Sequence, residues 1–98
     1  MEVTILSRDR CHLCHIALRI ARQVQADIPF TLRSIDITHD ERLFALYGHR
    51  IPVVLIDHDE RLAGKITERE LRAALKKTRW RKSISRILSR LGFHPNQG

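Results

Sequence analysis

The side chains in this sequence best suited to chemistry are two cysteines three residues apart, Cys11 and Cys14. They are the only cysteines in the sequence. On a helix this spacing puts the second sulfur on the same face one turn later, close enough for a disulfide. A purely structural bridge is a poor explanation, because closing so short a loop gains little entropy. In a reducing compartment such a pair is more often catalytic or metal-binding.

The cysteines fall where a predicted strand turns into a predicted helix. Residues 3–6 form a short apolar strand pattern, and apolar residues then recur at spacings of three and four over about residues 12–25. A cysteine at this turn faces unpaired N–H groups and the positive end of the helix dipole, which favour its thiolate. We therefore predict that Cys11 is the exposed nucleophile and that Cys14 resolves the mixed disulfide. Three neighbouring side chains would add positive charge beside Cys11: Arg8, Arg10 and His12.

A proline supplies an independent signal. Ile51 and Pro52 precede the most apolar run of the chain, residues 53–56. A proline immediately before a buried strand removes a donor from the sheet. A cis peptide bond there would turn the preceding backbone toward the cysteines. The alternative is an ordinary trans proline that starts a strand.

The remaining patterns predict an α/β fold in the order β-α-β-α-β-β-α. Strands are expected over about residues 30–36, 53–56 and 61–64, with a short helix over residues 40–47 and a polar turn over residues 57–60. Thr67 caps a last helix, with Glu70 three residues later as in a capping box. Because the strand over residues 53–56 is apolar on both faces, it should lie inside a mixed sheet between helices.

Positive charge is concentrated at the C-terminal end. Residues 1–75 carry 11 acidic and 11 basic side chains, so the formal net charge of +7 comes from residues 76–98, which have no acid. Apolar residues recur there at helical spacing, which predicts a further basic amphipathic helix from about residue 80 to residue 91. Its apolar stripe packs on the domain or on a second copy, or else the helix binds an anionic partner: a membrane surface, a nucleic acid or an acidic protein.

The length of 98 residues is sufficient for one domain, which we assign to residues 1–77, with residues 78–98 as a basic amphipathic extension. No apolar run approaches the ~20 residues of a transmembrane helix. The first residues lack the basic segment of a signal peptide. We therefore expect no transmembrane segment and a cytoplasmic location.

Several stretches together resemble a known family: residues 7–14, 35–37, 47–54 and 63–64. The chain resembles the glutaredoxin-like proteins of the thioredoxin superfamily, in particular the small bacterial group whose helix begins with a C-x-L-C motif. The resemblance covers residues 1–75. It implies a thioredoxin-like three-layer fold with a four-stranded sheet, a cis Pro52 beside the cysteines and thiol–disulfide exchange. The basic helix is extra to that fold.

The resemblance also implies how substrates and reductants would bind. The substrate would be a protein or small-molecule disulfide, and no cofactor is required. Glutathione is a candidate reductant. Glutaredoxins usually have proline and tyrosine between the cysteines, where this chain has His12 and Leu13. They also have two glycines and then acidic residues after the last strand, whereas here Gly64 is followed by residues 65–68, KITE, so a thioredoxin-type system is the alternative reductant. The candidate substrate-binding residues are Arg10, His12, Ile51, Pro52 and Gly64.

A second class of function remains open from the residues. Cys11, His12, Cys14 and His15 form a dense cluster that could bind zinc or share an iron–sulfur cluster. Four ligands within five residues cannot easily surround one ion, so such a site would need another chain or a distant residue such as His49. We predict no metal site. The alternative to an enzyme is a non-catalytic thioredoxin-fold module that binds through a shared metal or through the basic tail.

Overall fold

The computed structural model describes residues 1–92, so the end of the predicted extension, residues 93–98, lies outside the described residues. The elements follow one another as the sequence predicts, and the α/β fold is confirmed. In chain order they are β1 (Glu2–Ser7), α1 (His12–Gln25), β2 (Thr31–Asp36), α2 (Glu41–Tyr47), β3 (Val53–Ile56), β4 (Asp59–Ala63) and α3 (Glu68–Arg90).

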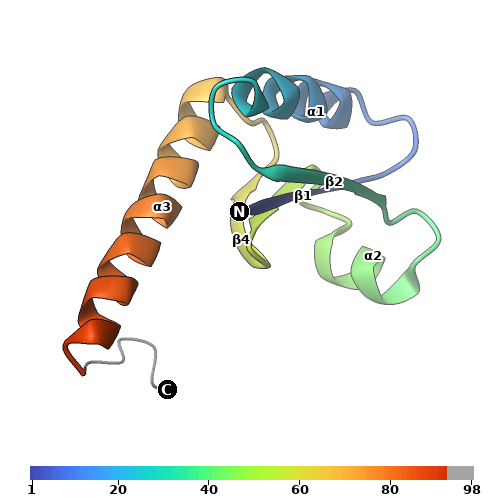
Figure 1. Cartoon of the computed structure of the whole chain (residues 1–98). Helices are drawn as coiled ribbons and strands as arrows, with labels where there is room; N and C mark the ends of the chain where they lie inside the picture. The colour runs from blue at the N-terminus through green and yellow to red at the C-terminus, as the bar shows by residue number, and fades with distance from the viewer. Residues whose placement is uncertain (93–98) are drawn as a thin grey trace.

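The four strands form one mixed sheet in the order β2-β1-β3-β4. β1 pairs parallel with β2 and antiparallel with β3, and β3 pairs antiparallel with β4. Helix α1 and the first turns of α3 cover one face of this sheet, while α2 covers the other (Figure 1). The result is the predicted three-layer arrangement.

Two apolar clusters fill the spaces on the two faces. On one face, α1 and α3 contribute Ala21 and Leu71 to a cluster that includes Val3, Ile5 and Val54. The smaller cluster on the α2 face consists of Leu6, Ile37 and Val53, with partly buried side chains of α2 against it. Successive side chains of a strand point to opposite faces. Neighbours such as Ile5 and Leu6 are therefore both buried, on opposite sides of the sheet.

The hairpin between β3 and β4 is tighter than the sequence predicts. A polar turn was expected over residues 57–60, but β4 already begins at Asp59. Asp57 and His58 both have positive φ, of 49° and 74°. Two successive residues of this kind are what a two-residue type I′ hairpin turn requires. Neither residue is glycine, so the sequence lacked the usual signal for this turn.

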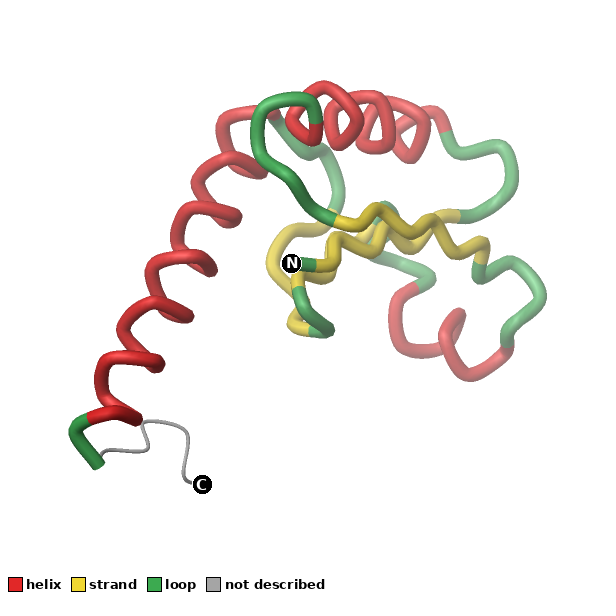
Figure 2. Tube along the Cα trace, viewed as in Figure 1, coloured by secondary structure: helices red, strands yellow, loops and turns green. Residues whose placement is uncertain are grey.

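Helix α3 is one continuous helix, where the sequence predicts two separate helical stretches. One was expected to begin at Thr67 and the other at about Trp80, yet a single helix runs from Glu68 to Arg90 (Figure 2). No glycine or proline lies within it to stop it. The predicted capping box is present: Thr67 Oγ1 accepts the Glu70 N–H at 3.1 Å, and Glu70 Oε1 accepts the Thr67 N–H at 3.2 Å.

Even α3, the longest helix, falls short of the apolar length that crossing a bilayer takes, and so do the other helices within residues 1–92.

Candidate active site

Strand register brings the candidate residues to one end of the sheet. β1 ends at Ser7, and its last pairs put Leu6 opposite Val53. Pro52 immediately precedes Val53, and Val53 pairs in turn with Ala63, which precedes Gly64. The loop over residues 8–11 leaves β1 at this same end. The backbone pairing thus places the cysteine loop, Pro52 and Gly64 together at one end of the strands.

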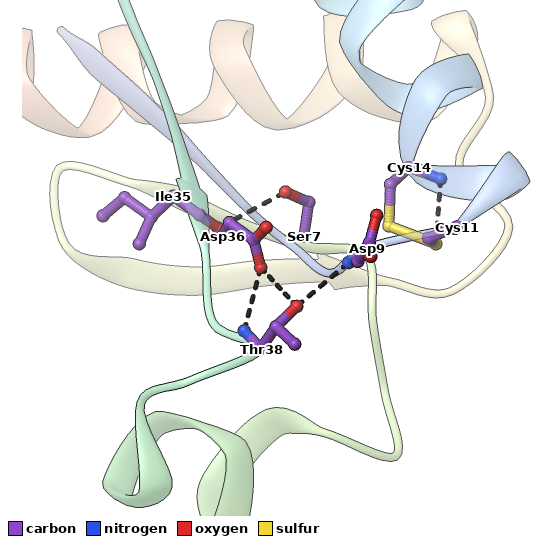
Figure 3. The surroundings of a disulfide bond; sticks show 7 residues. All are labelled: Ser7, Asp9, Cys11, Cys14, Ile35, Asp36 and Thr38. Atoms are coloured by element: carbon purple, nitrogen blue, oxygen red, sulfur yellow. Dashed lines mark hydrogen bonds between the residues drawn. A yellow bond between two sulfur atoms is a disulfide. The ribbon is translucent and has the colours of Figure 1, made fainter.

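The two cysteines are joined in a disulfide, with their Cα atoms 5.2 Å apart (Figure 3). Cys11 is the N-cap of α1, and its Sγ accepts a hydrogen bond from the Cys14 backbone N–H at 3.2 Å. The first turn of α1 contains no acidic residue. Both features favour negative charge on Cys11 Sγ once the disulfide is reduced, because the N-terminal N–H groups and the helix dipole face it.

The two cysteine residues differ in exposure. Cys14 is buried, with 6% of its surface exposed, whereas Cys11 is only partly buried. Cys11 is therefore the more accessible of the two cysteines to a molecule from solvent. Cys14 lies underneath, on the side of α1 that packs on the sheet.

A small hydrogen-bond network holds the loop that leads to Cys11. The Asp9 N–H donates to Thr38 Oγ1 at 3.0 Å, and the Thr38 hydroxyl donates to Asp36 Oδ1 at 2.5 Å (Figure 3). The Thr38 N–H donates to the same carboxylate oxygen at 2.8 Å. These hydrogen bonds from Thr38, the side-chain one first, lower the pKa of Asp36. Next in the loop, Arg10 adopts the left-handed conformation with φ of 57°, which is uncommon outside glycine.

Sequence reasoning assigned no role to Asp36 and Thr38. An aspartate two residues before a threonine is a local signal for a side-chain-to-backbone hydrogen bond. That signal could have identified the Asp36–Thr38 contact. It could not have identified the contact with Asp9, which is 29 residues away in sequence.

Ile51, Pro52 and Gly64 lie next to one another. The Ile51–Pro52 peptide bond is cis. Pro52 is buried and Ile51 partly buried. The Gly64 N–H donates to the Pro52 carbonyl oxygen at 2.8 Å and to the Arg50 carbonyl oxygen at 3.2 Å. Gly64 has φ of +78°, and a Cβ added to it would have no heavy atom within 4 Å.

Arg10 and His12 flank Cys11, and both side chains are exposed. Arg10 immediately precedes Cys11, the N-cap, and His12 is the first residue of α1. Over residues 1–92, the His, Cys, Asp and Glu side chains include no group of three or more placed to hold a metal ion.

Hollows also lie away from the cysteine pair. One of about 410 Å³ borders the loop network and is lined by Thr38, His39, Glu41, Phe44 and Ala45. Another of about 640 Å³ lies between the β3–β4 hairpin and α3, and its lining includes Asp57, Arg61, Trp80 and Lys82. This second hollow lies at the opposite end of β3 from Pro52, so it is not part of the thiol site.

Comparison with known proteins supports the architecture and identifies relatives of the chain. The model of the family described as "Glutaredoxin-like domain (DUF836)" matches residues 2–76. Uncharacterised proteins of Mycobacterium tuberculosis and Mycobacterium bovis are each 32% identical over 80 residues, which cover 74% of this chain and 79% of theirs.

Solved structures share the fold. A structural genomics target protein from X. campestris is 32% identical and superposes with a TM-score of 0.66, covering 76% of this chain and 96% of its own. A thioredoxin variant from Halobacterium salinarum is 18% identical, with a TM-score of 0.59 and coverage of 78% of this chain and 72% of its own. At that identity the thioredoxin supports the fold alone.

Proposed function

The chain belongs to the glutaredoxin-like domain family, and from this premise we propose that it is a thiol–disulfide oxidoreductase that reduces protein or small-molecule disulfides with Cys11 and Cys14. One observation carries the proposal. Cys11 caps the N-terminus of α1, accepts the Cys14 N–H through its sulfur and is more exposed than its partner. This is the arrangement that an attacking thiolate and a resolving thiol require.

The reaction balances as an exchange of two electrons. The Cys11 thiolate attacks one sulfur of the substrate disulfide, forms a mixed disulfide and releases the first substrate thiolate, which takes up a proton. Cys14 then loses its proton and attacks Cys11 Sγ. The Cys11–Cys14 disulfide forms, and the second substrate thiol leaves. An external thiol reductant, either glutathione or a thioredoxin-type dithiol, returns two electrons and two protons to the pair.

The surroundings of Cys11 suggest how a substrate would be held. The exposed side chains of Arg10 and His12 would contact acidic or polar groups of the substrate, and the Ile51–Pro52 segment would lie alongside the disulfide. Gly64 supports that segment through its hydrogen bond to Pro52. A cytoplasmic location fits the proposal, because a reducing compartment keeps the dithiol ready to react.

The test is reduction of a model disulfide, with glutathione and a thioredoxin system supplied separately as reductants. We expect turnover by the natural chain, loss of turnover in Cys11→Ser, and a trapped mixed disulfide in Cys14→Ser that mass spectrometry detects. The pH dependence of Cys11 alkylation in reduced Cys14→Ser should show a thiolate well below the free-cysteine pKa of ~8.5. No turnover with either reductant, together with a slow thiol of ordinary or raised pKa, would refute the proposal in favour of a non-catalytic binding module.

A further inference from the structure

The apolar side chains of α3 change face halfway along the helix. In its first half, residues 68–78, the buried side chains include Leu71, Leu75 and Thr78. In its distal half, residues 79–90, the corresponding apolar side chains Trp80, Ile84 and Ile87 each follow one of these by nine residues. Nine residues are about two and a half turns of 3.6 residues, so the second set points away from the first. The distal apolar side chains are therefore not part of the core cluster, although Trp80 and Ile84 also line the hollow between α3 and the β3–β4 hairpin.

Exposure agrees with this geometry. Trp80, Ile87 and Leu91 are 66%, 56% and 68% exposed, three of the most exposed large apolar side chains in residues 1–92. With Ile84 and Leu88, which are partly buried, they form what we call the distal stripe. The face of the distal half that continues the buried side is polar. Lys82 lies on it, seven residues after Leu75, and its Nζ is 2.6 Å from Asp57 Oδ2 on the β3–β4 turn.

Basic residues border the distal stripe on both sides. Arg79, Arg86 and Arg90, spaced by seven and four residues, align along one edge, and Lys77 and Arg81 along the other. All five are exposed. A helix with an apolar stripe between rows of cations is typical of segments that lie in the surface of a membrane, where the stripe enters the acyl boundary and the cations reach the headgroups.

We propose that the distal half of α3 is a docking surface for an anionic lipid membrane. Charge complementarity supports this partner, because residues 76–98 contain seven basic side chains and no acid. Each Lys or Arg near an anionic bilayer adds to the attraction. Docking of the same helix from a second copy would bring like charges together. A nucleic acid would satisfy the cations but leave the distal stripe in water, with one tryptophan for stacking.

The test uses the full chain and vesicles of phosphatidylcholine mixed with phosphatidylglycerol, with pure phosphatidylcholine vesicles beside them. Trp80 is the only tryptophan, so its fluorescence reports on the distal stripe directly. We expect a blue shift and flotation with the anionic vesicles, weakened by added salt and absent with neutral ones. A blue shift of the same size with neutral vesicles, or none with either, would overturn the proposal.

Matched variants distinguish the contributions of the distal stripe and of its bordering cations to vesicle binding from an effect of net charge alone. Ile87→Ser with Leu91→Ser should weaken vesicle binding at least about tenfold, because two aliphatic side chains no longer enter the lipid. Arg86→Gln with Arg90→Gln should weaken it about tenfold or more. The control, Arg19→Gln with Arg22→Gln on exposed positions of α1, removes the same charge and should change binding by less than about twofold.

Two further outcomes would also overturn the proposal. One is binding to a short DNA duplex at a salt concentration where anionic vesicles are not bound. The other is equal loss of binding in the α1 control and in the Arg86 and Arg90 variant. Far-UV circular dichroism of each variant checks that α3 remains helical, and Cys11→Ser should bind vesicles as the natural chain does.

Discussion

Asp57 and Lys82 form an ion pair that joins the β3–β4 turn to the distal half of α3, with 2.6 Å between Oδ2 and Nζ. The other carboxylate oxygen of Asp57 accepts the Glu2 N–H at 2.9 Å. The hydrogen bond from Lys82 is the largest of the effects that lower the pKa of Asp57, against a smaller effect of burial that raises it. One carboxylate thus connects the start of β1, the hairpin and the helix.

Removing this ion pair should lower the stability of the protein slightly without unfolding the domain. We expect Lys82→Ala to lower the free energy of unfolding by about 0.5–1 kcal/mol, a small effect because the Lys82 side chain is nearly half exposed. Urea denaturation measures it, and the loss should shrink in high salt. Lys76→Ala, at an exposed lysine of the same helix, is the control. Equal losses in the two variants would contradict a specific role of the Asp57 contact.

Acid should destabilise the protein through two carboxylates. The pKa values of Asp36 and Asp57 are lowered in the folded state from an ordinary value of 3.8. The unfolded chain therefore binds protons first as the pH falls, and the folded state loses their contribution. Stability from both groups should be complete above about pH 5 and decline through pH 4 and below. Denaturation at a series of pH values measures this loss of stability. Asp57→Asn should make the decline with falling pH less steep, and an unchanged slope would contradict a contribution from Asp57.

The loop before Cys11 should depend on Thr38. Thr38→Val keeps the shape of the side chain but removes the hydrogen bonds of its hydroxyl to Asp9 and Asp36. We expect a small loss of stability, because both hydrogen bonds are exposed to solvent. The pKa of Asp36 should rise toward its ordinary value, which NMR titration would detect. Ser34→Ala, at an exposed position of β2, is the comparison that should leave both quantities nearly unchanged.

A glycine should be required at position 64 because of its positive φ, and not because a side chain would clash there. Gly64→Ala meets no steric obstacle, yet φ of +78° is unfavourable for any residue with a Cβ. A cost of about 1–2 kcal/mol is expected from the left-handed conformation. Thermal denaturation measures the cost, with Lys65→Ala beside it as an exposed neighbour. A variant as stable as the natural chain would show that the turn relaxes around the new side chain.

Local patterns predicted the elements well where one periodicity dominated. The apolar positions of α1 recur at spacings of three and four without interruption, and α1 begins and ends where that pattern does. The run over residues 53–56 became β3 with the same bounds, and Val53, Val54 and Ile56 are buried because both faces of the sheet are covered. Thr67 caps α3 as the sequence indicates.

What the sequence could not predict depends on contacts between distant residues. Asp9 meets Thr38 across 29 positions, and Asp57 meets Lys82 only because α3 continues past the hairpin. The continuity of α3 was itself hidden, because the apolar pattern changes face near Thr78 and so resembles the start of a new helix. For the candidate site, the cysteines and Pro52 were recognisable from their neighbours in sequence, whereas the contact of Thr38 with the cysteine loop at Asp9 was not.

The ion pair and the disulfide lie at opposite ends of β1. Asp57 is held at Glu2, where the strand begins, and the loop to Cys11 leaves at Ser7, where it ends. A molecule seated on the distal half of α3 therefore does not cover Cys11. If Cys11 exchanges disulfides and the distal half of α3 binds a membrane, as proposed, then the two events are sterically independent, and a ligand of the distal half would not behave as a competitive inhibitor.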